Sequence, residues 1–241
     1  MKSGPPFRID VDSAWAPYFL LKVESELLII DFKYGFYPKC RDWLEALTKR
    51  TPIEKGKCLG KFSVTTPTLK SVELLGGGDI YNVGTFHSDE LKVHIGGPGQ
   101  VHLNQVVSGA VVAVLQGPGS LWLTGSAERA AYEMRGPGSV EAASFETTDV
   151  EVGVSGPASL RLHVRRRLTG RLDGPGKIVY SGSAETVSID KTFLGTVQHV
   201  ADGANSKQSP ALQDDLRSVR RYSSVSSTVV QMHSLKLPTC I

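Results

Sequence analysis

This sequence has few cysteines, little excess charge and no long hydrophobic run. It contains only three cysteines in 241 residues, so a disulfide framework cannot be what stabilises the fold. The formal net charge of +3 is too small to predict a nucleic-acid partner. Charged residues interrupt its most hydrophobic early stretch, YFLLKVESELLIIDF, which argues against a membrane-spanning segment. We therefore expect a protein that binds no nucleic acid and does not span a membrane.

The N-terminus also lacks the apolar stretch of a signal peptide. Its first ten residues, MKSGPPFRID, contain no hydrophobic run. If Met1 is the native start, this predicts a cytoplasmic protein. If a leader has been removed, the protein belongs at the cell surface or outside the cell, and the sequence leaves both possibilities open.

Turn-forming residues, in contrast, are abundant, with 25 glycines and 13 prolines. A Gly-Pro-Gly motif recurs at steps of 20, 19, 20 and 18 residues. The residues of these turns are Gly97, Pro98, Gly99, Gly117, Pro118, Gly119, Gly136, Pro137, Gly138, Gly156, Pro157, Gly174, Pro175 and Gly176. Ala158 replaces the third glycine of the fourth turn. A regular interval of this kind predicts a repeat architecture.

The residues that flank each turn alternate between apolar and polar. Every position two residues before the first glycine is apolar: Leu74, Ile95, Leu115, Met134, Val154 and Leu172. Every position four residues after it is also apolar: Ile80, Val101, Leu121, Val140, Leu160 and Ile178. A period of two predicts strands and excludes a helical repeat. Because one such unit cannot bury its apolar face alone, we predict an all-β, single-stranded parallel β-helix with rungs of about 20 residues.

The turn chemistry leads to a prediction about its backbone. Proline presets φ at the second position of a type II turn, and glycine supplies the positive φ at the third position. Alanine is unfavourable at positive φ. We therefore expect the turn that contains Ala158 to be of a different type or to be strained.

The sequence predicts that the chain has three parts. Residues 1–60 contain apolar stretches typical of strands, followed by KCRDWLEALTKR, an amphipathic helix over Lys39–Arg50 that could cap the solenoid. Residues 61–200 form the β-helix. Residues 201–241 are polar and aperiodic, which is typical of a flexible tail.

Two stretches, VTTPTLKSVELLGGGDI from Val64 and LKVHIGGPG from Leu91, resemble the head GIN domain family, which is grouped with the autotransporter adhesins. The likeness extends over about residues 7–200. It implies a β-helical, non-enzymatic, adhesin-like module at a surface. This chain differs in having proline where the family usually has serine, and in having no export leader at its start.

One outward row gives the candidate binding site. Five residues after each turn glycine stand Tyr81, His102, Trp122, Glu141 and Arg161, followed by Val179. Stacked rungs would bring the three aromatic rings about 4.8 Å apart, as a surface for sugar rings or a protein. Glu141 beside Arg161 predicts a salt bridge between rungs. The alternative is that the segment around Trp43 or the N-terminal strands cover this row.

Catalytic and metal sites are not indicated. A glycan-active β-helix enzyme would need converging carboxylates, and the acidic residues here fall in different columns. The six histidines show no metal-ligand spacing. We expect no metal, no cofactor and no catalytic residues.

These observations favour a non-enzymatic binding or scaffold module that presents side chains of a β-helix to a glycan or protein partner. Two alternatives stay open. One is an intracellular structural protein that assembles through its solenoid ends, with self-association. The other is a glycan-active β-helix enzyme.

Overall fold

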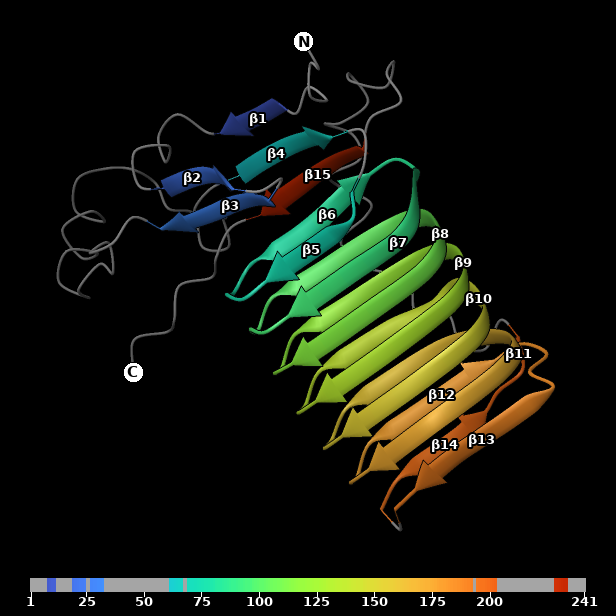
Figure 1. Ribbon diagram of the computed structural model, residues 1–241. Coiled ribbons are helices and arrows are strands. Elements are labelled where there is room, and N and C mark those ends of the chain that lie inside the picture. The colour runs from blue at the N-terminus through green and yellow to red at the C-terminus, as the bar shows by residue number, and fades with distance from the viewer. Residues whose placement is uncertain are drawn as a thin grey trace, which may run out of the picture.

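The computed structural model describes residues 8–11, 19–24, 27–32, 61–66, 69–192, 194–202 and 228–233 (Figure 1). All regular elements in this part of the chain are strands. They are β1 (Arg8–Val11), β2 (Phe19–Glu24), β3 (Leu27–Phe32), β4 (Lys61–Thr66), β5 (Ser71–Leu74), β6 (Asp79–Val83), β7 (Phe86–Ile95), β8 (Gln100–Gln116), β9 (Ser120–Arg135), β10 (Ser139–Ser155), β11 (Ser159–Asp173), β12 (Lys177–Ser181), β13 (Thr186–Lys191), β14 (Thr196–His199) and β15 (Thr228–His233). None of the described segments is a helix that could cross a membrane.

The strands from β5 to β14 form a parallel β-solenoid, which confirms the predicted fold class. Each of β8, β9, β10 and β11 begins after one Gly-Pro-Gly turn, passes through a bend and ends at the next turn. Figure 1 shows these strands stacked as successive rungs of one solenoid. The chain therefore has two kinds of corner in each rung, the Gly-Pro-Gly turn and a bend between turns.

The apolar columns expected from the sequence line the interior. Val101 pairs in register with Leu121, and Val140 pairs with Leu160. All the residues predicted to follow the turns are at most 1% exposed. The residues predicted to precede the turns are also buried, except Leu74 in the first rung, which is partly buried. Each rung thus covers the apolar face of the next, which a single rung could not bury alone.

The Gly-Pro-Gly turns differ from the predicted type II geometry. In four of the five turns the left-handed residue is the first glycine, with φ of +141° at Gly117, +111° at Gly136, +102° at Gly156 and +106° at Gly174, whereas Gly97 has no positive φ. At Gly138 the third position is also crowded, because a Cβ there would lie 2.8 Å from the carbonyl oxygen of Gly117 in the rung below. Ala158 holds the same position in the next turn and has no positive φ. The strain expected at Ala158 is therefore absent, because it rested on a left-handed backbone that this turn does not place at its third residue.

The bend opposite the turn has no sequence motif but repeats a backbone feature. In four rungs the bend contains a residue with a left-handed backbone, namely Gly84, Gln105, Gly125 and Gly182. Gln105, with φ of 53°, is the one described residue other than glycine with positive φ. In the first rung, the Asn82 side chain donates hydrogen bonds to the carbonyl oxygens of Gly84 and Asn104, both at 2.8 Å.

The sheet continues beyond β6 through antiparallel strands. β15 lies between β6 and β4, and β1 pairs with the outer side of β4. The strands expected near the N-terminus are present as β1, β2 and β3. The predicted helix Lys39–Arg50 lies outside the described residues. Within the predicted flexible tail, Thr228–His233 forms β15, so this part of the tail has a defined backbone.

Candidate functional site

The predicted outward row occupies one column on the strands that follow the turns. Tyr81 of β6 pairs with His102 of β8, which pairs with Trp122 of β9. The row continues through Glu141 of β10 to Arg161 of β11. Five consecutive rungs thus bring together side chains that are 80 residues apart at the two ends of the row. We call these five residues the outward row.

The three rings of the outward row stack on one another. The ring centroids of Tyr81 and His102 are 4.6 Å apart with an interplanar angle of 15°. Those of His102 and Trp122 are 5.7 Å apart with an angle of 8°. Because nearly parallel rings face each other, their flat faces are occupied by the neighbouring rings. The stack therefore presents ring edges along its length, and not the flat platform on which a sugar ring would stack.

His102 is the most enclosed member of the outward row. Its residue surface is only 2% exposed, although it belongs to an outward column. This burial removes water from the imidazole and lowers the pKa of His102 to about 4. The ring is therefore neutral at physiological pH. Its Nε2 lies 3.3 Å from Oε1 of Gln100, within hydrogen-bond distance.

The charged end of the outward row forms the expected pair. The Nε atom of Arg161 lies 3.5 Å from Oε2 of Glu141, and the two side chains are 29% and 14% exposed. The predicted salt bridge between rungs is confirmed. Val179 follows in the same column and is 7% exposed. The outward row thus changes from aromatic to ionic and then to aliphatic along the solenoid.

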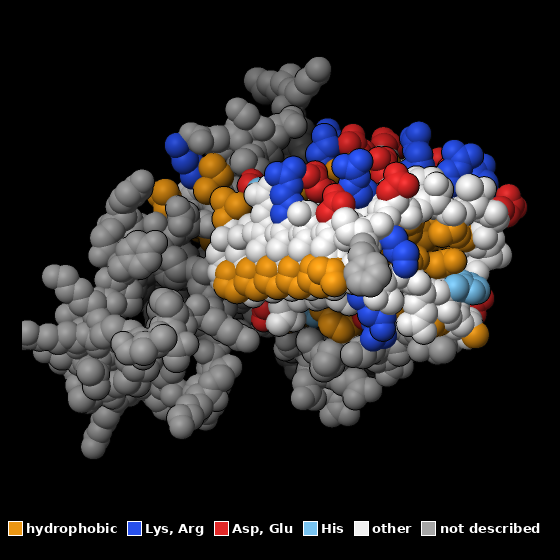
Figure 2. All heavy atoms as spheres, turned by 90° about the horizontal axis from the view of Figure 1, so that it is seen from below, with side chains coloured by type: hydrophobic (Ala, Val, Ile, Leu, Met, Phe, Trp, Pro, Cys, Tyr) orange, Lys and Arg blue, Asp and Glu red, His pale blue; other side chains and the backbone are white. Residues whose placement is uncertain are grey.

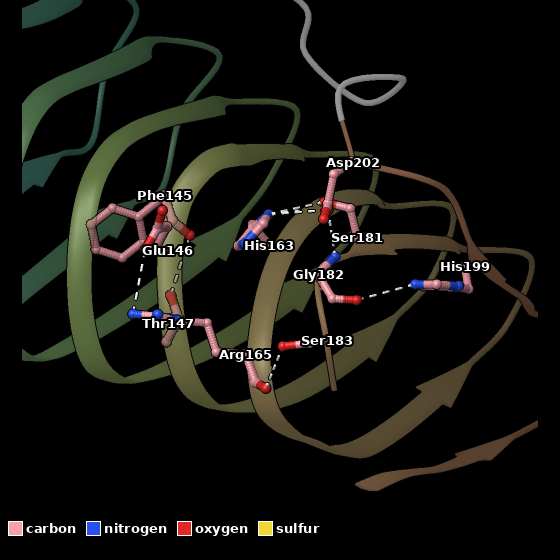
Figure 3. Close-up of polar contacts among 10 residues, drawn as sticks. All are labelled: Phe145, Glu146, Thr147, His163, Arg165, Ser181, Gly182, Ser183, His199 and Asp202. Carbon is pink, nitrogen blue, oxygen red and sulfur yellow. Dashed lines mark hydrogen bonds and ion pairs between the residues drawn. The ribbon is translucent and has the colours of Figure 1, made fainter. Parts of the chain in front are cut away.

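A second polar cluster lies at the far end of the solenoid, where the chain leaves β14 (Figure 3). The Nδ1 atom of His163 lies 3.2 Å from the Ser181 hydroxyl and 3.7 Å from a carboxylate oxygen of Asp202. Asp202 also accepts a hydrogen bond of 2.8 Å from the backbone N–H of Gly182. In a hydrolytic triad the serine and the acid would contact different nitrogens of the histidine. Here both face Nδ1, so the cluster fits a structural role at the end of the solenoid.

Several acidic side chains of the described residues pair with neighbouring cations. Ion pairs link Glu90 with Lys92, Glu133 with Arg135, Glu146 with Arg165, Asp149 with Arg166, and Asp173 with Arg171. The hydrogen bond from Arg166 lowers the pKa of Asp149. Within the described part of the chain, no three His, Cys, Asp or Glu side chains meet as metal ligands.

Sequence reasoning missed two surface features. One is an open groove of about 960 Å³ at the bends of β7 to β11, with small residues such as Gly109, Ser126 and Ala127 among those lining it. The other is the exposure of the turn prolines Pro98, Pro118, Pro137, Pro157 and Pro175. Figure 2 shows a straight hydrophobic stripe along the solenoid. The sequence contained small residues such as Gly109, Ser126 and Ala127 along the groove and a proline at each turn, but we interpreted the prolines only as turn formers.

Several solved structures are similar to this chain, among them one from Bacteroides fragilis and two from Parabacteroides distasonis. A "putative adhesin" from Bacteroides fragilis is 21% identical with a TM-score of 0.67, covering 82% of this chain and 83% of that one. A "putative adhesin" from Parabacteroides distasonis is 17% identical with a TM-score of 0.56, covering 80% and 83%. A "putative lipid binding protein" from the same species is 18% identical with a TM-score of 0.53, covering 83% and 86%. At these identities the likeness shows the fold alone.

No curated protein matches this chain. A family model does, over residues 4–184, and it is described as "Putative auto-transporter adhesin, head GIN domain". This range includes the outward row and all five Gly-Pro turns. The chain therefore belongs to the head GIN domain family of auto-transporter adhesins, as its repeats and strand motifs indicated.

Proposed function

We propose that this chain is a binding module, without catalytic activity of its own, that presents the outward row to a glycan or protein partner. The observation that carries the proposal is the continuity of the row over five rungs, with stacked rings at one end and an ion pair at the other. The family description as an adhesin supports the same general role.

The rigidity of the row favours binding. Each of its members lies on a strand paired with strands on both sides. The side chains are further restrained by ring stacking and by the ion pair. A partner would therefore meet groups that lose little conformational entropy on binding. Tyr81 and Trp122, both partly exposed, offer the apolar contacts, and the partly exposed Arg161 offers hydrogen-bond donors.

The orientation of the stacked rings also limits how a partner can contact the outward row. Since ring faces are used within the stack, a glycan would meet ring edges and the Glu141–Arg161 pair rather than a flat aromatic surface. Glycan recognition through this row would thus rest on hydrogen bonds to Arg161 as much as on apolar contact. A protein partner could use the same groups, because aromatic and arginine side chains are enriched in protein interfaces.

Two other functions are less well supported by the described residues. An enzyme would need carboxylates aimed at a substrate, whereas several of those described pair with an arginine or lysine neighbour. A similar structure is named a lipid-binding protein. In this chain, however, side chains such as Phe145 and Leu123 fill the interior of the described solenoid, and the hollows beside Val93 and Gly109 are open to the surface.

A glycan array screened with the full chain, alongside Trp122→Ala, tests the proposal. Val114→Ala is the matched control, because Val114 is also a partly exposed outward residue but lies on the strand segment that precedes a turn. Circular dichroism would establish that both variants fold. We expect binding that is lost in Trp122→Ala and kept in Val114→Ala. Binding that survives Trp122→Ala would contradict the assignment of the row, and the same variants in a protein pull-down would decide between partner classes.

A further inference from the structure

The last rung of the solenoid ends in a strand with a free outer edge. β13 pairs with β11 on one side, and within the described residues it has no strand on the other side. Among the described solenoid strands, it is the longest with only one neighbour. In Figure 1 it lies at the end of the solenoid away from β1. An edge of this kind presents unpaired N–H and C=O groups to any strand that can match it.

The hydrophobic core also runs out at this edge. Leu168 of β11 is fully buried, whereas Val187, its partner in register on β13, is 41% exposed. Ile189 lies two residues further along β13, on the same face, and is only partly buried. Nearby, Leu194 is 65% exposed. Among the described residues, no further rung covers these side chains.

The sequence of β13 is complementary to itself when two copies run antiparallel. If Ser188 lies opposite Ser188 of a second copy, Val187 lies opposite Ile189, and Glu185 lies opposite Lys191. All of these odd-numbered residues share one face of the strand. Two apolar pairs are then flanked by two ion pairs. If the two strands shift by one residue, neither the apolar pairs nor the ion pairs form, so these pairs favour one register over its immediate neighbours.

The charges needed for this pairing are available. Glu185 extends β13 in the sheet, because its backbone N–H donates a hydrogen bond of 2.8 Å to the carbonyl oxygen of Arg166. Glu185 and Lys191 are both exposed. Among the described residues, neither is held in a close ion pair, although Glu185 is attracted by Arg166 of the neighbouring strand. Cross-strand pairs of opposite charge stabilise antiparallel strands, and like charges in the same positions destabilise them.

We propose that two copies of this chain associate through the outer edges of β13, antiparallel about Ser188. The contact is isologous, so it closes as a dimer with two-fold symmetry. On the other side of the sheet, β15, β4 and β1 follow β6, so that direction does not repeat the β13 edge. Assembly then stops at two copies and does not continue into a filament. Because a single rung contributes the contact, we expect a weak dimer in the micromolar range.

Charge exchange tests the register. In sedimentation experiments on the full chain at low salt, the wild type should show a concentration-dependent dimer. Lys191→Glu or Glu185→Lys alone places like charges opposite each other and should weaken dimerisation about tenfold. The double variant restores both pairs with reversed polarity and should recover the wild-type affinity. A wild type that stays monomeric throughout, or a double variant as weak as the single ones, would overturn the proposal.

A cysteine at the symmetry axis gives an independent test. With Cys40, Cys58 and Cys240 replaced by serine, Ser188→Cys puts two thiols directly opposite each other, at a separation that a disulfide can bridge. Oxidation should then give a covalent dimer on a non-reducing gel. Thr186→Cys is the matched control, because it lies on the same strand but far from its own copy in this register. Equal cross-linking of both variants, or of neither, would contradict the pairing.

Discussion

At one corner of each rung the chain turns through Gly-Pro-Gly, whereas at the other corner it bends through residues that share no motif. At the turn, successive rungs approach at constant distance, and a Cβ on Gly138 would lie 2.8 Å from the oxygen of Gly117. At the bend, the strand registers shift by different amounts, by one residue between Leu103 and Val106 and by three residues between Ala142 and Glu146, where β10 pairs with β11. A repeated motif therefore occurs in the sequence only where the distance between the backbones of successive rungs is also repeated.

Gly125→Ala should break the bend and have the largest effect on stability. The added Cβ would lie 2.1 Å from the carbonyl oxygen of Val106, and φ at this glycine is +120°. We expect a loss of about 4 kcal/mol in the free energy of unfolding, measured by urea denaturation. Gly153→Ala is the matched control, because a Cβ there meets no atom within 4 Å. A similar loss in both variants would show that close approach at the bend is not the cause.

His102 lies on a strand between the turn and the bend. Because it is buried there, the free energy of unfolding should depend on pH. Burial lowers its folded-state pKa from 6.5 to about 4, so below pH 6.5 the unfolded chain binds a proton that the folded chain does not. The contribution is complete above pH 6.5 and falls as the pH decreases towards 4. We expect a loss of about 3 kcal/mol over that range.

The measurement is urea unfolding at several pH values, with wild type compared with His102→Gln. The variant keeps a polar side chain but cannot titrate. The difference between the two proteins should therefore shrink as the pH falls. A constant difference from pH 7 to pH 4 would contradict the burial of a neutral imidazole at this position.

Gly138→Ala tests the turn in the same way as Gly125→Ala tests the bend, and we expect a smaller effect. The nearest backbone oxygens, those of Gly117 and Gly119, would lie 2.8 Å and 3.0 Å from the new Cβ. A loss of about 2 kcal/mol in the free energy of unfolding follows from this overpacking. Ala158 already carries a Cβ at the equivalent position of the next turn, buried to 1% exposure. If Gly138→Ala is neutral, the third glycine is not required by close approach.

The two corners also explain how much could be predicted from the sequence. The turns and the apolar columns repeat at a nearly constant interval, so the solenoid and its interior followed from spacing alone. The proximity of Tyr81, His102 and Trp122 was predicted from the same register. The orientation of the rings was not, because it depends on how neighbouring side chains pack and not on their position along the strand. β15 could not be predicted, since its pairing with β6 joins segments more than 140 residues apart.

Where the bend has a left-handed position, different residues occupy it in different rungs, and Gln105→Gly can measure what this position requires. An L-residue with a side chain is disfavoured at φ of 53°, and glycine is not. Against this gain stand the greater backbone entropy of glycine and the hydrogen bond of 2.7 Å that Thr85 donates to the Gln105 side chain. We expect a net stabilisation of about 0.5 kcal/mol in urea unfolding. Gln105→Ala separates the two effects, because it loses the hydrogen bond and keeps the strain, and it should destabilise the protein. If both variants destabilise equally, the hydrogen bond outweighs the backbone, and the bend tolerates a side chain at positive φ because the neighbouring rungs hold it there.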